Sequence, residues 1–321
     1  MPMQPNITRI RPYWVNFIEY FSRKPSSELN RFLFLYFYPI VFICGLTGNS
    51  LSAVLMFDRR FRRHSYSAYI AVLAASDSVS LIGTFMASTN LIVYSLTGDV
   101  IIRFTDVHTC RLPEHVFYAS SLISSWIIVS ITLERCFAVV SPFTARIFCT
   151  RKVARIVTVA VVSFSFAFTS YAAAITSYDG EFGCFISSLR GMKAHYAIAP
   201  SSFIYSPICI ITLLNVVIIR SLSTSSLSLI RSNKTKLHSN NTQKITVTVL
   251  AVSITFLILL TPMASICILV AVIPNLPVAN WLDTAQFVFS INYAVNFYIY
   301  CLTGTEFRKT LKQCFQCRKI E

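Results

Sequence analysis

The sequence predicts an all-α membrane protein: a seven-transmembrane helix bundle followed by a short amphipathic eighth helix. Of its 321 residues, 55% are hydrophobic and only 13% are charged, whereas soluble proteins average about 25% charged residues. Seven apolar stretches each reach the ~20 residues that a helix needs to cross the hydrocarbon core of a bilayer. These stretches are Phe32–Phe57, Tyr66–Leu96, Pro113–Val140, Val153–Thr176, Tyr196–Ile219, Ile245–Ile273 and Trp281–Leu302.

Each stretch must be helical, because backbone polar groups in lipid need hydrogen-bond partners within their own segment. A transmembrane β-barrel would instead show ~10-residue segments of alternating polarity, and the sequence contains none. We therefore expect an outer tail at 1–31, a seven-helix domain at 32–302, and an amphipathic helix with a short tail at 303–321.

The basic residues predict the orientation of the bundle. Of the 28 Lys and Arg residues, 19 fall near the loops after the first, third and fifth stretches and in the tail after the seventh. Basic loops stay in the cytoplasm, which places the N-terminus outside a multi-pass plasma-membrane protein. The net charge of +15 then reflects topology and contact with membrane lipids, not binding of nucleic acid. No cleavable signal peptide is visible, and Asn6-Ile7-Thr8 is a glycosylation sequence on the outer tail.

Two pairs of cysteines have predicted roles. On this topology Cys110 and Cys184 are the only cysteines on the oxidising outer side, so we expect them to form one disulfide. Cys314 and Cys317 follow the last stretch in a basic, partly amphipathic segment. They are candidates for palmitoylation, with free surface thiols as the alternative.

Polar residues inside the apolar stretches indicate a functional core. An ionisable group is costly in a bilayer, and Asp77 is the only acid in the middle of a stretch. Ser120 and Ser124 share one helical face of the third stretch, and Asn292 and Asn296 share one face of the seventh. Their oxygens, with those of Asp77, suit a small hard cation such as Na⁺. The alternative is a carboxyl group that is held by hydrogen bonds alone.

The end of the third stretch carries a recognisable motif. Glu134-Arg135-Cys136 and the Ser141-Pro142-Phe143 that follow resemble the Asp/Glu-Arg-Tyr region of rhodopsin-like (class A) G-protein-coupled receptors. The likeness covers nearly the whole chain. It includes Gly48-Asn49, Asp77, Cys110 at 25 residues before Arg135, Pro207, Pro262, Asn296–Tyr300 in place of Asn-Pro-x-x-Tyr, and Thr305–Phe315 as the eighth helix.

This resemblance implies a receptor that binds an extracellular ligand and activates a heterotrimeric G protein, with arrestin as a further partner. It assigns the coupling switch to Glu134, Arg135, Asn296 and Tyr300, and it implies no cofactor beyond an allosteric Na⁺. A narrower likeness to invertebrate FMRFamide-receptor-like neuropeptide receptors rests on residues 214–220 and 291–308. It also rests on the absence of a tryptophan before Pro262, where Leu260 stands.

The chain also departs from the family pattern. Phe297 replaces the proline of the seventh stretch, which should leave that helix straighter. Asn215 stands where many members carry a tyrosine. No acid occurs at Asn241–Lys244 to hold Arg135, so we expect measurable basal signalling.

The ligand class follows by exclusion. Phe117 stands where amine receptors carry aspartate, and Ser290 stands where opsins carry the retinal lysine. The outer third instead offers a mixture of charged, amide and aromatic residues: Asn90, Arg111, Glu114, Phe117, Tyr118, Asp283 and Gln286. This mixture suits a short peptide, and Glu114 or Asp283 could pair with a peptide arginine. The alternative is that these charges are solvated helix ends, with Arg111 paired to Glu114.

Other functions are disfavoured. A transporter would show internal repeats and broken helices, and neither is found. An intramembrane enzyme would need paired acids or a metal cluster, and the five histidines have no zinc-type spacing. Among receptors, a non-peptide chemosensory or lipid ligand remains the rival to a peptide.

Overall fold

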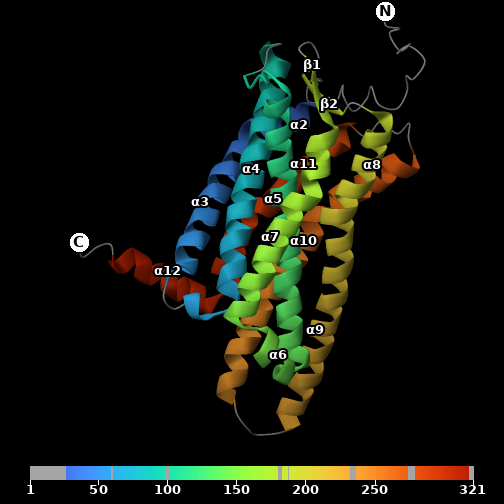
Figure 1. Ribbon diagram of the computed structural model, residues 1–321. Coiled ribbons are helices and arrows are strands. Elements are labelled where there is room, and N and C mark those ends of the chain that lie inside the picture. Colours follow the sequence, from blue (N-terminus) through green and yellow to red (C-terminus); the bar gives the residue numbers. More distant parts are fainter. Residues whose placement is uncertain are drawn as a thin grey trace, which may run out of the picture.

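The computed structural model describes residues 27–58, 61–97, 101–179, 183–186, 188–231, 236–273 and 279–317. Within these residues, seven long helices form one elongated bundle, which confirms the predicted architecture (Figure 1). The helices are α3 (Tyr38–Met56), α4 (Tyr66–Thr97), α5 (Val107–Val140), α7 (Arg151–Ile175), α9 (Ser206–Arg231), α10 (Lys236–Val272) and α11 (Ala279–Thr303).

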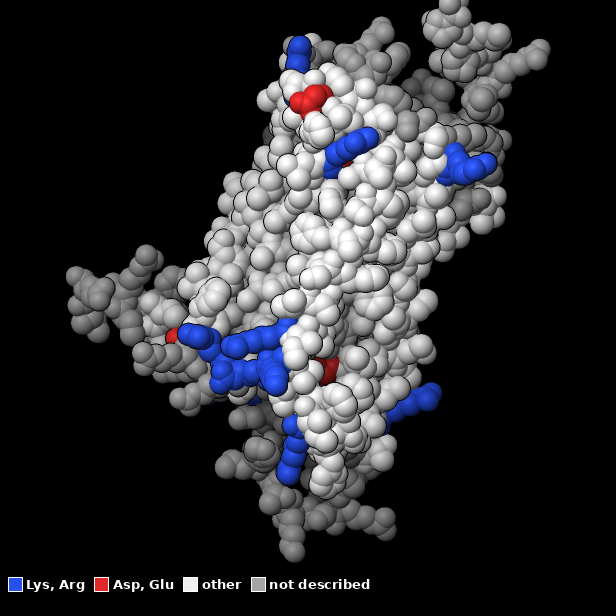
Figure 2. All heavy atoms as spheres, viewed as in Figure 1, with Lys and Arg blue, Asp and Glu red and all other residues white. Residues whose placement is uncertain are grey.

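Six of these helices, with the segments that extend them, are long and apolar enough to cross a membrane. The seventh, α11, also has ample length, at 25 residues, but it carries Asp283, Gln286, Asn292 and Asn296. Figure 2 shows Lys and Arg gathered near the two ends of the visible face, with none across its middle. This charge-free band is what a lipid-facing surface requires, because charged side chains are costly in the hydrocarbon region.

The helix α5 lies at the centre of the bundle. Two thirds of its most apolar window is buried, against two fifths or less in the other spans. It begins at Val107, six residues before the predicted Pro113, because Asp106 caps it: the Asp106 carboxylate accepts hydrogen bonds from the N–H groups of His108 (2.7 Å) and Thr109 (2.9 Å). The helix α10 likewise begins before the predicted Ile245, so the apolar stretch marks only its membrane part.

Two helices are extended by π-helical segments that the sequence analysis did not predict. The segments α2 (Glu28–Phe32) and η2 (Leu33–Phe37) precede α3, and α8 (Leu189–Pro200) and η4 (Ser201–Tyr205) precede α9. Such wide turns place an extra residue in the helix and occur often at functional sites.

A short hairpin closes one end of the bundle, which we call the hairpin end. Its strands β1 (Thr176–Asp179) and β2 (Gly183–Ile186) are antiparallel, with Tyr178 opposite Cys184. Cys184 forms the predicted disulfide with Cys110 in the first turn of α5, with a Cα–Cα distance of 5.7 Å. The hairpin is thereby fastened over the central helix.

The opposite end, which we call the α12 end, carries the last helix. The helix α12 (Thr305–Cys317) leaves the bundle at a steep angle (Figure 1). Arg308 Nη1 donates to the carbonyl oxygens of Cys301 (3.0 Å) and Leu302 (2.6 Å), so it satisfies the last carbonyls of α11. The helix α11 continues without interruption through Phe297, and Gly48 of α3 allows close approach there: a Cβ on Gly48 would lie 2.9 Å from Cβ of Phe297.

Two further short helices lie at the α12 end. They are η3 (Phe61–Arg63) and α6 (Pro142–Phe148), and the sequence analysis predicted neither. Of the modification candidates, Cys314 is exposed on α12, while Asn6 and the side chain of Cys317 lie outside the described residues.

Candidate functional site

A polar layer crosses the middle of the bundle at Asp77. The carboxyl group is fully buried. One carboxylate oxygen accepts from the Ser124 hydroxyl at 2.6 Å, and the other accepts from the Asn296 amide at 2.8 Å. Asp77 therefore joins α4 to both α5 and α11, and a movement of any of these helices changes its partners.

The other predicted members of this layer make no hydrogen bond to Asp77 itself. The Ser120 hydroxyl bonds to that of Ser80 at 2.8 Å, and the Asn292 carbonyl accepts from Asn296 at 3.5 Å. Two residues that sequence reasoning missed complete the layer. They are Ser80, one helical turn after Asp77, and Tyr293, whose hydroxyl donates to Ser121 at 3.0 Å.

The α12 end holds the predicted coupling motif. Arg135 and Glu134 form an ion pair, and both are more than nine-tenths buried. The hydroxyl of Ser65, just before α4, donates to the same oxygen of Glu134. Ser65 was missed because a serine at a helix start is common and its partner lies 69 residues away. Glu134 is thus shared between Arg135 and a neighbouring helix.

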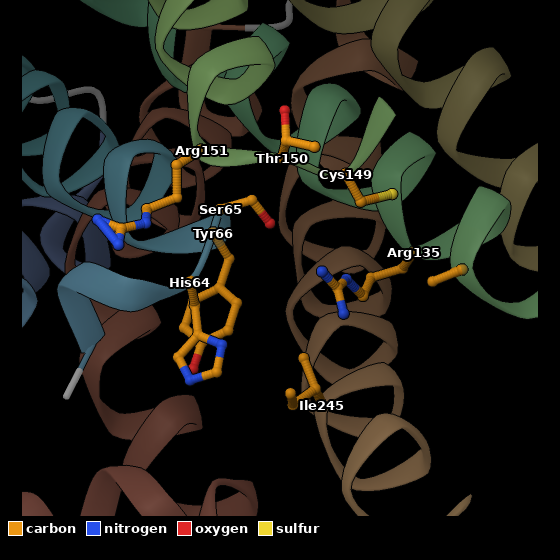
Figure 3. A pocket seen from close by; sticks show the side chains of 9 residues that line it. His64, Ser65, Tyr66, Arg135, Cys149, Thr150, Arg151 and Ile245 are labelled. Atoms are coloured by element: carbon orange, nitrogen blue, oxygen red, sulfur yellow. The ribbon is translucent and has the colours of Figure 1, made fainter. Parts of the chain in front are cut away.

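A cavity of about 470 Å³ opens beside Arg135 (Figure 3). Arg135 extends from α5 toward His64 and Tyr66, and its guanidinium carbon lies 6.0 Å from the centre of the Tyr66 ring. Arg151, at the first turn of α7, also lines this cavity. Among the described residues, the Nε of Arg135 has no hydrogen-bond partner. The cavity is therefore bordered by a buried cationic donor with unused capacity.

A second cavity of about 280 Å³ adjoins the first. Its surface is mostly apolar, with apolar side chains from α3, α4, α5 and α10 and Phe307 of α12, and Tyr300 of α11 reaches it. Tyr300 is 5% exposed, and its hydroxyl has no hydrogen-bond partner within the described part of the chain. Of the four predicted switch residues, Glu134 and Arg135 form the ion pair beside the first cavity, and Tyr300 borders the second. Asn296 belongs to the Asp77 layer.

At the hairpin end, Thr176 joins two of the predicted ligand-contacting residues. Arg111 Nε donates to the Thr176 carbonyl at 2.9 Å, and the Thr176 hydroxyl donates to Glu114 at 2.8 Å. Arg111 and Glu114 therefore both hold β1, and between these two described residues no ion pair is formed. The alternative that Arg111 pairs with Glu114 at i, i+3 is therefore not what the structure shows; both side chains contact the hairpin instead.

The second predicted acid, Asp283, has a different environment. It is 2% exposed beneath α2, where the Asn30 amide donates to its carboxylate at 3.2 Å. The Thr284 hydroxyl in turn donates to the side-chain amide oxygen of Asn30 at 2.9 Å. The segment before α3 is thus bound to the first turns of α11. No sequence signal pointed to Asn30.

The remaining predicted pocket residues are spread over the hairpin end. Asn90 makes two hydrogen bonds of 2.9 Å with the backbone of Ile102, so it holds the segment before α5. The Tyr118 hydroxyl bonds to His195 of α8 at 2.9 Å. Phe117 packs at 5.5 Å from the Tyr118 ring, and Gln286 is half-buried on α11.

Asn215 replaces the expected tyrosine of the fifth span. Its amide oxygen accepts from the Ser253 hydroxyl at 2.9 Å, and both residues are buried. This bond links α9 to α10 at the depth where the sequence departs from the family pattern. A buried polar pair is a specific connection between these helices, because leaving either group unpaired would cost free energy.

A seven-helix bundle with a disulfide-fastened hairpin at one end, a polar layer at its centre and an ion-paired arginine at the other end defines a membrane receptor. The family model of the seven-transmembrane receptors of the rhodopsin family matches residues 48–300. The chain belongs to that family, so it is a multi-pass membrane receptor and not an enzyme.

Individual relatives match shorter segments. The chain is 32% identical over 131 residues to the trissin receptor of Drosophila melanogaster, covering 41% of this chain and 19% of the relative. It is 27% identical over 132 residues to the cholecystokinin receptor of Xenopus laevis (40% and 27% covered). It is 33% identical over 110 residues to the B1 bradykinin receptor of Canis lupus familiaris (33% and 29% covered). The matches span less than a third of each relative, and the narrower FMRFamide-receptor likeness stays a prediction.

Proposed function

We propose that this protein binds a short extracellular peptide at the hairpin end and activates a heterotrimeric G protein at the α12 end. The observation that carries the proposal is Arg135: it stands buried beside an open cavity, held by Glu134, at the end of the central helix opposite to the hairpin. The Arg135 guanidinium group can therefore contact a partner protein once its ion pair with Glu134 is broken.

The proposed orientation places the hairpin end outside the cell. The disulfide between Cys110 and Cys184 supports this orientation, because disulfides persist in oxidising compartments. The loops of the α12 end carry most of the basic residues, as cytoplasmic loops do.

A peptide is the ligand class that the hairpin end favours. Cholecystokinin and bradykinin, the ligands named for two of the relatives, are peptides. Glu114 is the better candidate for pairing with a peptide arginine, because its side chain is partly exposed beside the Thr176 hydroxyl, whereas Asp283 is 2% exposed and covered by Asn30. We infer an amidated peptide with arginine near its C-terminus, as the FMRFamide-receptor likeness suggests. An arginine there could form two hydrogen bonds at once with a receptor carboxylate.

Activation would proceed as a shift between two helix arrangements, driven by the ligand's differential affinity for them. The contacts of Asp77 with Ser124 and Asn296 would rearrange as α11 moves against α4 and α5. The end of α10 nearest α12 would move outward, and Arg135 would contact the G protein. Arrestin would use the same face.

Na⁺ would stabilise the resting arrangement. Asp77 would supply carboxylate oxygens, and the Ser124 hydroxyl oxygen lies 2.6 Å from one of them. The Asn296 amide donates its N–H to the other oxygen at 2.8 Å, so it would have to turn its amide oxygen toward the ion. When bound, the ion would supply charge compensation for a carboxylate that is removed from solvent.

The proposal is tested by screening amidated peptides against cells that express the receptor, with G-protein dissociation as the readout. An active peptide should be silent on Arg135→Ala at equal surface expression. If peptides fail and a lipid or other small molecule activates, the receptor assignment stands and the peptide class is wrong. If the receptor dissociates no G protein, either with any ligand or in its basal state, the coupling proposal is wrong.

The ligand anchor is tested by removing single charges. Losing one side of a desolvated ion pair costs about 2–5 kcal/mol. Glu114→Gln should therefore reduce potency at least ~30-fold. The matched control is Glu28→Gln at the same end, an exposed acid that pairs with Arg31. If Glu114→Gln and Asp283→Asn both leave potency within about threefold of wild type, neither acid anchors the peptide.

A further inference from the structure

The two cavities at the α12 end share part of their lining and differ in chemistry, and we treat them as the two halves of one candidate site. The polar cavity, of about 470 Å³, is lined by Arg135, Arg151 and Ser65, among others. The apolar cavity, of about 280 Å³, is lined mainly by side chains such as Ile131 and Val249. His64, Tyr66 and Ile245 border both cavities, so the two halves meet at these side chains.

The polar half is electropositive. Arg135 keeps an unpartnered Nε although it is 93% buried, since its exposed fraction is 7%. Its one ion-pair partner in the described part of the chain, Glu134, is also bonded to Ser65. Arg151 adds a second guanidinium group in the first turn of α7, where the helix dipole also favours an anion.

His64 lies within the positive potential of the same two arginines. Burial lowers the pKa of His64, and the guanidinium groups of Arg135 and Arg151 lower it further. Cations that disfavour a positive charge on His64 favour a negative charge at the same place. The polar half therefore has the electrostatic character of an anion site.

The apolar half suits a hydrocarbon chain. Ile70, Ile128 and Val252 are at least nine-tenths buried and border it, and Phe307 of α12 closes one side. Most of the surface that this half exposes is apolar, although threonine side chains and Lys244, at the start of the apolar part of α10, also border it. A fully polar anion would leave this half without a partner, whereas an alkyl chain would remove its apolar surface from water.

We propose that the joined cavities bind an anionic single-chain amphiphile, with its headgroup against Arg135 and Arg151 and its chain in the apolar half. Both ends of such a ligand find complementary surface within one site whose two halves meet at His64, Tyr66 and Ile245. A bound amphiphile would keep Arg135 engaged, and would oppose coupling. This consequence for signalling rests on the proposed function, whereas the binding itself does not.

Binding is tested with purified full-length receptor in discs of neutral phosphatidylcholine, without peptide or G protein. The probe is radiolabelled dodecyl phosphate, with empty discs as the blank. Inorganic phosphate and dodecanol are the competing arms, since each carries only one half of the chemistry. We expect saturable binding of dodecyl phosphate that neither arm displaces at equal concentration.

Two variants with matched controls locate the site. Arg151 and Arg146 are both exposed, but only Arg151 borders the cavity, so Arg151→Gln should weaken binding about tenfold and Arg146→Gln should not. Thr248 borders the apolar half, whereas Val247 beside it is 49% exposed on the outside of α10. Thr248→Trp should abolish binding, and Val247→Trp should leave it unchanged.

Three outcomes overturn the proposal. Equal binding to all four variants shows partition into the disc. Displacement by inorganic phosphate alone shows an anion site without a chain-binding half, and displacement by dodecanol alone shows an apolar site without a headgroup. Arg151→Gln is a surface change that the fold tolerates, so the test does not depend on Thr248→Trp folding. Because no G protein is present, these outcomes are independent of whether the receptor couples.

Discussion

Replacing Ser65 by alanine should raise ligand-independent signalling. The Ser65 hydroxyl donates to the carboxylate of Glu134, which also holds Arg135. Ser65 and Glu134 are 8% and 6% exposed, so water replaces the lost hydrogen bond poorly. Without this bond the Glu134 side chain is less firmly fixed, and the resting arrangement, in which Glu134 pairs with Arg135, loses stability.

The size of the effect follows from the chemistry of this bond. A hydrogen bond to a charged group contributes about 1.5–3 kcal/mol net to the state that contains it. At the lower figure, the ratio of active to resting receptor rises roughly tenfold, because 1.4 kcal/mol is a factor of ten. A receptor that is ~1% active without ligand would then become ~10% active. Tenfold is reached only if the active arrangement lacks the bond entirely.

The assay measures basal G-protein dissociation at matched surface expression. The control is Ser67→Ala: this serine is also buried and lies two residues away, but its hydroxyl donates to the backbone carbonyl of His64. Basal activity should rise in Ser65→Ala and stay near wild type in Ser67→Ala. Equal basal activity in wild type and both variants would show that the bond does not restrain Arg135.

Three further predictions concern the other parts of the site. Arg135→Ala should abolish coupling while peptide affinity, measured by radioligand binding, is retained; a variant that couples normally would remove Arg135 from the mechanism. Asp77→Asn should eliminate any effect of Na⁺ on agonist affinity. If the agonist affinity of the wild-type receptor is the same in sodium and in choline, there is no ion site. Burial and, after it, the neighbouring Arg135 and Arg151 keep the pKa of His64 below its ordinary value, and a bound anion would offset the repulsion from these cations. Dodecanesulfonate does not titrate near neutral pH, so its binding should be accompanied by protonation of His64 and should strengthen as the pH falls. The His64→Gln variant should lose this pH dependence of binding.

The sequence by itself determined the architecture and the pairing of the outer cysteines. Seven apolar stretches of ~20 residues leave a helical bundle as the physical solution, because lipid offers no hydrogen-bond partners. Topology then left Cys110 and Cys184 together on one side, and the structure joins them. Asp77 and Arg135 stood out for a related reason: an ionisable group in or beside an apolar span is costly unless it has a role.

Only the tertiary structure decided what these groups touch. Ser65 and Glu134 are 69 residues apart, Thr176 and Glu114 are 62 apart, and Asn30 and Asp283 are 253 apart. Such contacts leave no local signal, because serine, threonine and asparagine fit helix starts, turns and solvent equally well. The two cavities at the α12 end are likewise unfilled space between helices, which depends on how side chains from several spans pack together and is not encoded in any one of them.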